Sequence, residues 1–136
     1  AAGTEQLLGS LNGVFYTDAS TSKPTFQAYL LGSNTATDIV ALINDDPHQV
    51  YEIRSNNGSA SLATDVGNTA EISYSAGATP NYISRTTLDD GTLGTSSQQL
   101  KIVGVSRDPD NNDIGSAGVV WRVVISEHFF KQHAGI

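Results

Sequence analysis

Cysteine is absent from this chain of 136 residues. There can therefore be no disulfide, no thiolate metal site and no thiol nucleophile, and the fold depends on its apolar core alone. Charge is also scarce, because only 15% of the residues are charged against about a quarter in an average globular domain. Serine, threonine and asparagine supply the polarity instead, which is typical of strands and loops.

Basic residues and long apolar runs are both in short supply. Seven lysines and arginines face 14 aspartates and glutamates, and the formal charge of -7 argues against binding to a phosphate backbone. No apolar run approaches the ~20 residues that a membrane-spanning helix needs. The N-terminus also lacks a basic start followed by an apolar segment, so we expect no membrane association and no export through a signal of its own.

What the chain does contain is a pattern of strands, centred on residues 96–130. Residues 98–106 and 119–126 are rich in β-branched side chains and are joined by a polar link, which predicts an antiparallel pair. Alternation in the second strand places four large residues on one face, which we expect to be the core face. These residues are Val119, Trp121, Val123 and Ile125.

Shorter strands are expected before this pair. They cover residues 14–17, 25–31, 39–43, 50–54, 71–74 and 84–88. The continuous apolar run Ile39–Ile43 predicts a buried strand, and Asp89–Asp90–Gly91 predicts a turn. Turn signals recur at short intervals and no helical periodicity persists. This combination predicts an all-β fold, either a compact antiparallel sandwich or a small barrel.

Both ends of the chain carry apolar residues in polar surroundings. Residues 1–13 predict an extended N-terminal arm, and residues 14–136 a single β domain with a C-terminal tail. Adjacent phenylalanines in that tail cannot both be buried on one face of a strand. The five apolar residues of the two ends are the candidate contacts with a partner or another subunit: Leu7, Leu8, Leu11, Phe129 and Phe130.

The histidines and acidic residues give no catalytic or metal-binding pattern. His48, His128 and His133 are scattered, and solvated side chains are the favoured interpretation. Residues 108–113 place oxygen donors at alternate positions, as at the start of a calcium loop, but Asp113 and Val119 stand where glycine and glutamate are required.

The two Asp-Asp pairs, at residues 45–46 and 89–90, are neighbours on an extended chain, so their carboxylates point apart. We therefore expect no metal, no cofactor and no enzyme activity.

Six short blocks resemble the small head proteins of tailed bacteriophages, the decoration or cement proteins. The blocks are Gly13-Val14-x-Tyr16, Lys23-Pro24-x-Phe26-x-x-Tyr29, Asp45-Asp46-Pro47-x-x-Val50-Tyr51-Glu52-Ile53, Asp65-Val66-Gly67, Leu100-Lys101-Ile102-Val103-Gly104 with Asp108-Pro109-Asp110-Asn111, and Val123-Val124-Ile125-Ser126-Glu127-His128. The residues before Gly13 match nothing in the pattern.

This resemblance implies a β-rich virion protein on the outer face of an icosahedral head. Its partner would be the major capsid protein, and three copies would assemble around three-fold or quasi-three-fold positions. The protein would be made in the host cytoplasm and would clamp neighbouring capsomers without catalysis.

Two other classes remain open at this point. A host- or glycan-binding β-module would use exposed aromatic side chains as a stacking platform, and its candidates are Tyr29, Tyr74 and Tyr82. A β-fold hydrolase is the third possibility, although no acid, base or nucleophile can be named for it.

Overall fold

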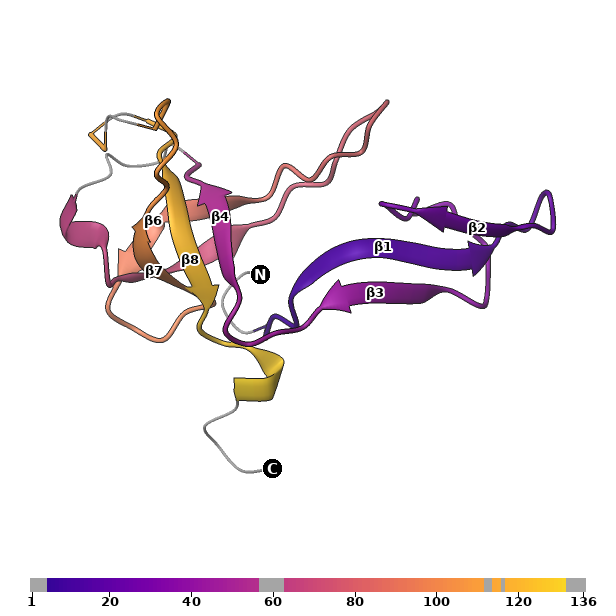
Figure 1. The fold of residues 1–136 in the computed structure, drawn as a ribbon, viewed down its shortest axis with the longest axis horizontal. Coiled ribbons are helices and arrows are strands. Elements are labelled where there is room, and N and C mark those ends of the chain that lie inside the picture. Colours follow the sequence, from indigo (N-terminus) through magenta and orange to yellow (C-terminus); the bar gives the residue numbers. More distant parts are fainter. Residues whose placement is uncertain (1–4, 57–62, 112–113, 116, 132–136) are drawn as a thin grey trace.

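The computed structural model describes residues 5–56, 63–111, 114–115 and 117–131. These residues form two antiparallel sheets and contain no α-helix (Figure 1). The strands are β1 (Ser10–Thr17), β2 (Pro24–Gln27), β3 (Val40–Asn44), β4 (Val50–Arg54), β5 (Thr69–Ser73), β6 (Thr87–Gly94), β7 (Leu100–Val105) and β8 (Val120–Ile125). Two short 3₁₀ turns cover Ala63–Asp65 and Phe129–Lys131. No helical segment of the described chain is long and apolar enough to cross a membrane.

The five-stranded sheet, which we call the body, has the order β4-β8-β7-β5-β6. Its centre is the predicted antiparallel pair of β7 and β8, and the predicted core face of β8 is confirmed. Trp121 is fully buried and lies opposite Ile53 of β4 and Val105 of β7. The buried core consists of Ala70, Leu88, Leu100, Ile102, Val119, Trp121, Val123 and Ile125.

The two edge strands of the body approach each other without closing a barrel. A single parallel bridge links Ser55 to Leu88 of β6, and the Asn56 amide donates a hydrogen bond to the Leu88 carbonyl at 2.9 Å. Beside this bridge, the buried Asp90 carboxylate accepts a hydrogen bond from the Ser55 hydroxyl. The sheet is therefore strongly curled around its core.

The prediction of a turn at Asp89–Asp90–Gly91 is wrong, because these residues lie inside β6. Asp89 pairs with Glu71 of β5. The Asp90 carboxylate accepts a hydrogen bond from Ser55, which follows the opposite edge strand of the sheet. Partners distant in sequence have thus overridden the local preference of Asp-Gly sequences for turns.

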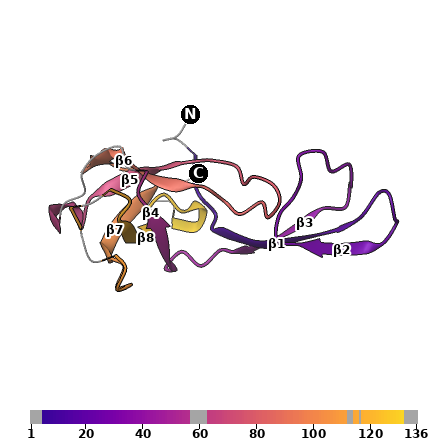
Figure 2. The same ribbon diagram turned by 90° about the horizontal axis from the view of Figure 1, so that it is seen from above.

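The three-stranded sheet has the order β2-β1-β3 and lies beside the body, not against its face (Figures 1 and 2). Phe15 of β1 is paired with Phe26 of β2 on one side and with Val40 of β3 on the other. The expected all-β class is confirmed. The expected compact sandwich or small barrel is corrected to two antiparallel sheets placed side by side, with no closed barrel among the described strands.

The strand predicted over residues 39–43 exists as β3, but its predicted burial is wrong. Val40 is 53% exposed and Leu42 is 47% exposed. The run is apolar on both faces, as in a strand covered from both sides. No second sheet covers it, because the chain places β3 at an edge of the projecting sheet, away from the body core.

The first described residues are held on the body by the C-terminal segment. The Leu7 amide donates to the Glu127 carbonyl at 3.0 Å, and the Phe129 amide donates to the Leu7 carbonyl at 3.0 Å. Ser10 to Gly13 belong to β1. The predicted arm over residues 1–13 is therefore not confirmed, and its residues 1–4 lie outside the described part of the chain.

Candidate functional site

A groove of about 1000 Å³ opens between the three-stranded sheet, the body and the loop formed by residues 74–86. This loop projects from the body on the same side as the three-stranded sheet (Figure 1). The rings of Tyr29 and Tyr82 stack with centroids 4.5 Å apart, which joins the loop to the segment that follows β2. Two parts of the chain that are distant in sequence therefore share the groove wall.

The groove is lined mainly by apolar side chains. Leu11 enters it from the three-stranded sheet, and Tyr51 and Ile53 enter it from the body. Glu52 is the only charged residue among the described residues that line it.

One face of the three-stranded sheet, here called the open face, is apolar and uncovered. It consists of Phe15, Phe26, Val40 and Leu42, which the strand register places on one side. Their exposed fractions are 46%, 57%, 53% and 47%. The Phe26 ring lies over Gly13, where a Cβ atom would come within 2.3 Å of Cζ. These four side chains form a contiguous exposed apolar patch, and such patches are a common feature of interaction surfaces.

The opposite face of the same sheet is better covered. Val14 and Tyr16 are buried there, and the Tyr16 hydroxyl donates to the Gln27 side-chain carbonyl at 3.0 Å. Leu11 shares this face through its pairing with Ile43 and lines the groove. The sheet thus turns one face to the groove and leaves the open face to solvent.

Three of the predicted contact residues form a second exposed surface, here called the terminal patch. Leu8, Phe129 and Phe130 are 36%, 54% and 59% exposed. The two phenylalanine rings meet edge to face with centroids 5.3 Å apart. The bridge between Leu7 and His128 brings the N-terminal segment beside them.

The other two predicted contact residues lie elsewhere. Leu7 is half-buried and packs on the body core, so it anchors the N-terminal segment. Leu11 is 48% exposed and lines the groove. The structure thus separates the five residues into an anchor, a groove residue and a surface patch.

The expected solvated histidines are corrected at one position. His48 is exposed, but His128 is only 1% exposed. Its Nδ1 atom accepts a hydrogen bond from the Phe130 amide at 3.1 Å, while its Nε2 atom has no partner among the described residues. His128 therefore fixes the turn that presents Phe129 and Phe130. His133 lies outside the described residues.

The segment 108–113 forms a turn in its described part. The Asp108 carboxylate accepts from the Asp110 amide at 3.0 Å. Asn111 joins this turn to the start of β8, because the Val120 amide donates a hydrogen bond to the Asn111 side-chain oxygen at 2.8 Å. Within the described ranges, no three His, Cys, Asp or Glu side chains are grouped so as to hold a metal ion. Asp113 lies outside these ranges.

Two aspartates at the far end of the three-stranded sheet have lowered pKa values. Hydrogen bonds from the Ser20 hydroxyl and from the Thr21 and Ser20 amides lower the pKa of Asp18 to about 2. Hydrogen bonds from the Thr17 hydroxyl and amide lower the pKa of Asp38. Both carboxylates are charged at neutral pH, which makes this end of the sheet anionic.

Sequence reasoning missed a third surface, here called the basic face of the body. It lies on the side of β4, β8 and β7 opposite the core, and it carries Arg54, Lys101 and Arg122. Valines lie between these cations, at Val50, Val103, Val120 and Val124. Glu52, opposite Arg122, is the one acidic residue there. The sequence could have predicted this face. In an alternating strand, the residues between two core residues point to the opposite side, and here these residues include the three cations.

No family model matches the chain, and no curated protein and no solved structure is significantly similar to it.

Proposed function

We propose that the chain is a virion structural protein, a decoration or cement protein that binds the outer surface of a phage capsid. The observation that carries the proposal is the projecting three-stranded sheet with its uncovered open face. Phe15, Phe26 and Val40 are each about half exposed. A sheet of this kind gains stability when another molecule covers it, and such a protein works by holding molecules together.

The terminal patch is the proposed contact with the major capsid protein. Phe129 and Phe130 are large aromatic side chains presented on a short turn, and aromatic residues often dominate the binding energy of an interface. The resemblance to phage head proteins in six short sequence blocks supports a capsid as the partner. It also supports a homotrimer around a three-fold position on the capsid exterior.

Stabilisation would follow from mass action. A protein that binds the expanded shell and not its dissociated subunits stabilises the shell by RT ln(1 + [L]/Kd). Here [L] is the concentration of the free protein and Kd is its dissociation constant from the shell. Neither a catalytic group nor a cofactor is needed for that role. The groove, with one charged residue among its described lining, is consistent with it.

The test uses empty expanded heads of a tailed bacteriophage, assembled from its major capsid protein. The protein should bind in a fixed copy number and raise the temperature at which the heads dissociate. Replacing Phe129 and Phe130 with serine should weaken binding by about tenfold or more. The control is Ile83→Ser, because Ile83 is 71% exposed on the 74–86 loop, away from the terminal patch. Heads that stay bare and equally labile would contradict the proposal.

A glycan-binding module is the second candidate, and one observation favours it. Tyr29, Tyr74 and Tyr82 all line the groove, and two of them are stacked. Aromatic faces beside polar groups such as Ser75 and Ser84 suit the apolar and hydroxyl faces of a sugar. Specific binding on a glycan array that is lost in Tyr82→Ala, combined with no binding to heads, would favour this candidate.

A further inference from the structure

We propose that the open face of one copy packs on the basic face of the body of a second copy, in a head-to-tail contact. The proposal extends the trimer named above by assigning the two surfaces that meet. It rests on the chemistry of these surfaces and does not require the capsid role. The occupant of the open face is thus another molecule of this same chain.

The shape of the molecule requires an external partner for the open face. In both views the three-stranded sheet projects away from the body (Figures 1 and 2). The four open-face residues, Phe15, Phe26, Val40 and Leu42, therefore stay in solvent in a single copy. Covering them would release the water that they now contact.

Charge decides between the possible pairings of these surfaces. Asp18, Asp38, Asp45 and Asp46 lie at the two ends of the three-stranded sheet, against one cation, Lys23. Two open faces packed on each other would bring these carboxylates together, in a chain whose formal charge is already -7. A face-to-face dimer of the sheets is therefore disfavoured.

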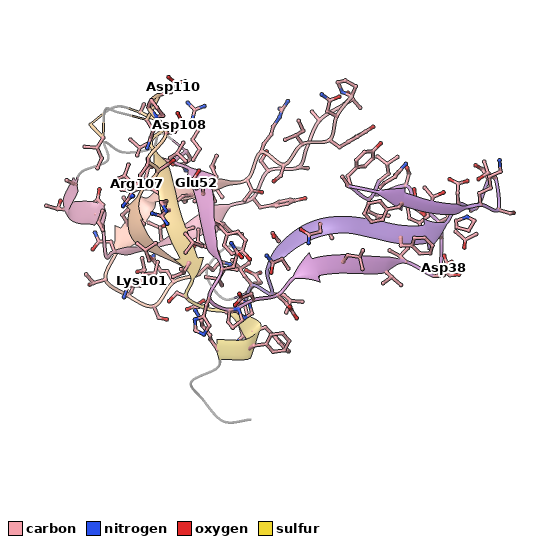
Figure 3. The ribbon with its side chains drawn as sticks, in the orientation of Figure 1. Asp38, Glu52, Lys101, Arg107, Asp108 and Asp110 are labelled. Carbon is pink, nitrogen blue, oxygen red and sulfur yellow. The ribbon has the colours of Figure 1, made fainter. Side chains whose placement is uncertain are left out.

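The basic face has the opposite charge. On β4, β8 and β7 it carries three of the seven basic residues of the chain, at Arg54, Lys101 and Arg122, against the carboxylate of Glu52. On β5 and β6 the same side of the sheet carries Glu71 and Asp89. None of these three cations forms an ion pair with a described carboxylate. Figure 3 shows Lys101 and Glu52 on the body and Asp38 at the far end of the three-stranded sheet. The carboxylates of one copy can thus meet the unpaired cations of the next.

The apolar parts of the two surfaces also match. Val124 of β8 lies between Val50 of β4 and Lys101 of β7. The basic face therefore has apolar side chains next to its cations. Val50 is 37% exposed and Val103 is 45% exposed. The open face is apolar, and the basic face has valines on either side of the opposed Arg122 and Glu52. A contact between two different patches repeats from copy to copy, and it closes into a ring where the rotation permits.

Mixed variants test this pairing directly. The sheet variant carries Phe26→Ser and Val40→Ser, and the body variant carries Arg54→Glu and Lys101→Glu. In a head-to-tail contact each variant keeps one intact half of the interface. The wild type should associate with rising concentration, each variant alone should weaken that association about tenfold or more, and an equimolar mixture should form a dimer. Sedimentation velocity measures all four samples.

Controls separate loss of contact from loss of folding. Ile83→Ser with Val66→Ser removes exposed apolar side chains outside both surfaces, and Arg85→Glu reverses a charge on the 74–86 loop. Both should associate as the wild type does. Fluorescence of the buried Trp121 should be unchanged in every variant.

A monomeric wild type would overturn the proposal, and so would a body variant that associates as the wild type does. Association without binding to heads would contradict the capsid role alone.

Discussion

At the scale of single residues, hydrogen bonds and not ion pairs set the properties of the charged groups. Asp18 is partly exposed, and the Ser20 hydroxyl and the Thr21 and Ser20 amides lower its pKa to about 2 from an ordinary 3.8. The bonds stabilise the carboxylate form over the protonated acid. They also hold together the turn between β1 and β2.

This gives a prediction for the pH dependence of that turn. Because the folded pKa of Asp18 is lower than the unfolded pKa, its contribution to stability is present above about pH 4 and is lost as the pH falls toward about 2. The carboxyl carbon of Asp18 should titrate in NMR spectra with a midpoint near 2. Ser20→Ala should raise this midpoint, and Ser22→Ala should leave it unchanged. A wild-type midpoint near 3.8 would contradict the assignment.

At the scale of elements, the junction between the body and the three-stranded sheet depends on close backbone contact. Gly9 has a φ of +152°, and a Cβ atom there would lie 1.8 Å from the Asn44 carbonyl oxygen. Asn44 ends β3, and Ser10 begins β1 opposite it. Any side chain at position 9 would push the two strands apart at their base.

Gly9→Ala should therefore lower the melting temperature clearly, by several degrees for a loss of about 1–3 kcal/mol in a domain of this size. Gly32→Ala is the matched control, because no atom lies within 4 Å of the added Cβ and the backbone there is unstrained. That variant should melt within about one or two degrees of the wild type. Equal melting of the two variants would mean that the junction is not as tight as described.

At the scale of the whole molecule, the two sheets contribute unequally to the free energy of unfolding. Nearly all of the buried apolar side chains belong to the body, where Ile102 is fully buried. The three-stranded sheet buries only Val14 and Tyr16 among its large apolar residues. A single copy therefore has one true core and a projecting sheet that another molecule can stabilise.

Ile102→Ala should lower the free energy of unfolding by about 2–5 kcal/mol, because it leaves a cavity in the core. Leu42→Ala should cost less than about 1 kcal/mol in dilute protein, since Leu42 is 47% exposed. Urea unfolding, followed by the fluorescence of Trp121, measures both values. Similar losses for the two variants would show that the open face is already covered in a single copy.

The sequence by itself determined the central strand pair and its core face. Alternation in β8 predicted Val119, Trp121, Val123 and Ile125 as core residues, because neighbouring side chains of a strand point to opposite faces. The sequence also predicted Phe129 and Phe130 as exposed apolar residues at the end of the chain.

Only the tertiary structure decided which apolar strands are covered and which polar residues are buried. An apolar run such as Ile39–Ile43 has the same pattern in a central strand and in a projecting edge strand, so pattern alone could not reveal the open face. Asp90 is buried where Ser55 supplies its hydrogen bond, and His128 is buried where the N-terminal segment pairs with it through Leu7. Burial depends on partners distant in the chain, and local sequence carries no information on where the fold places them.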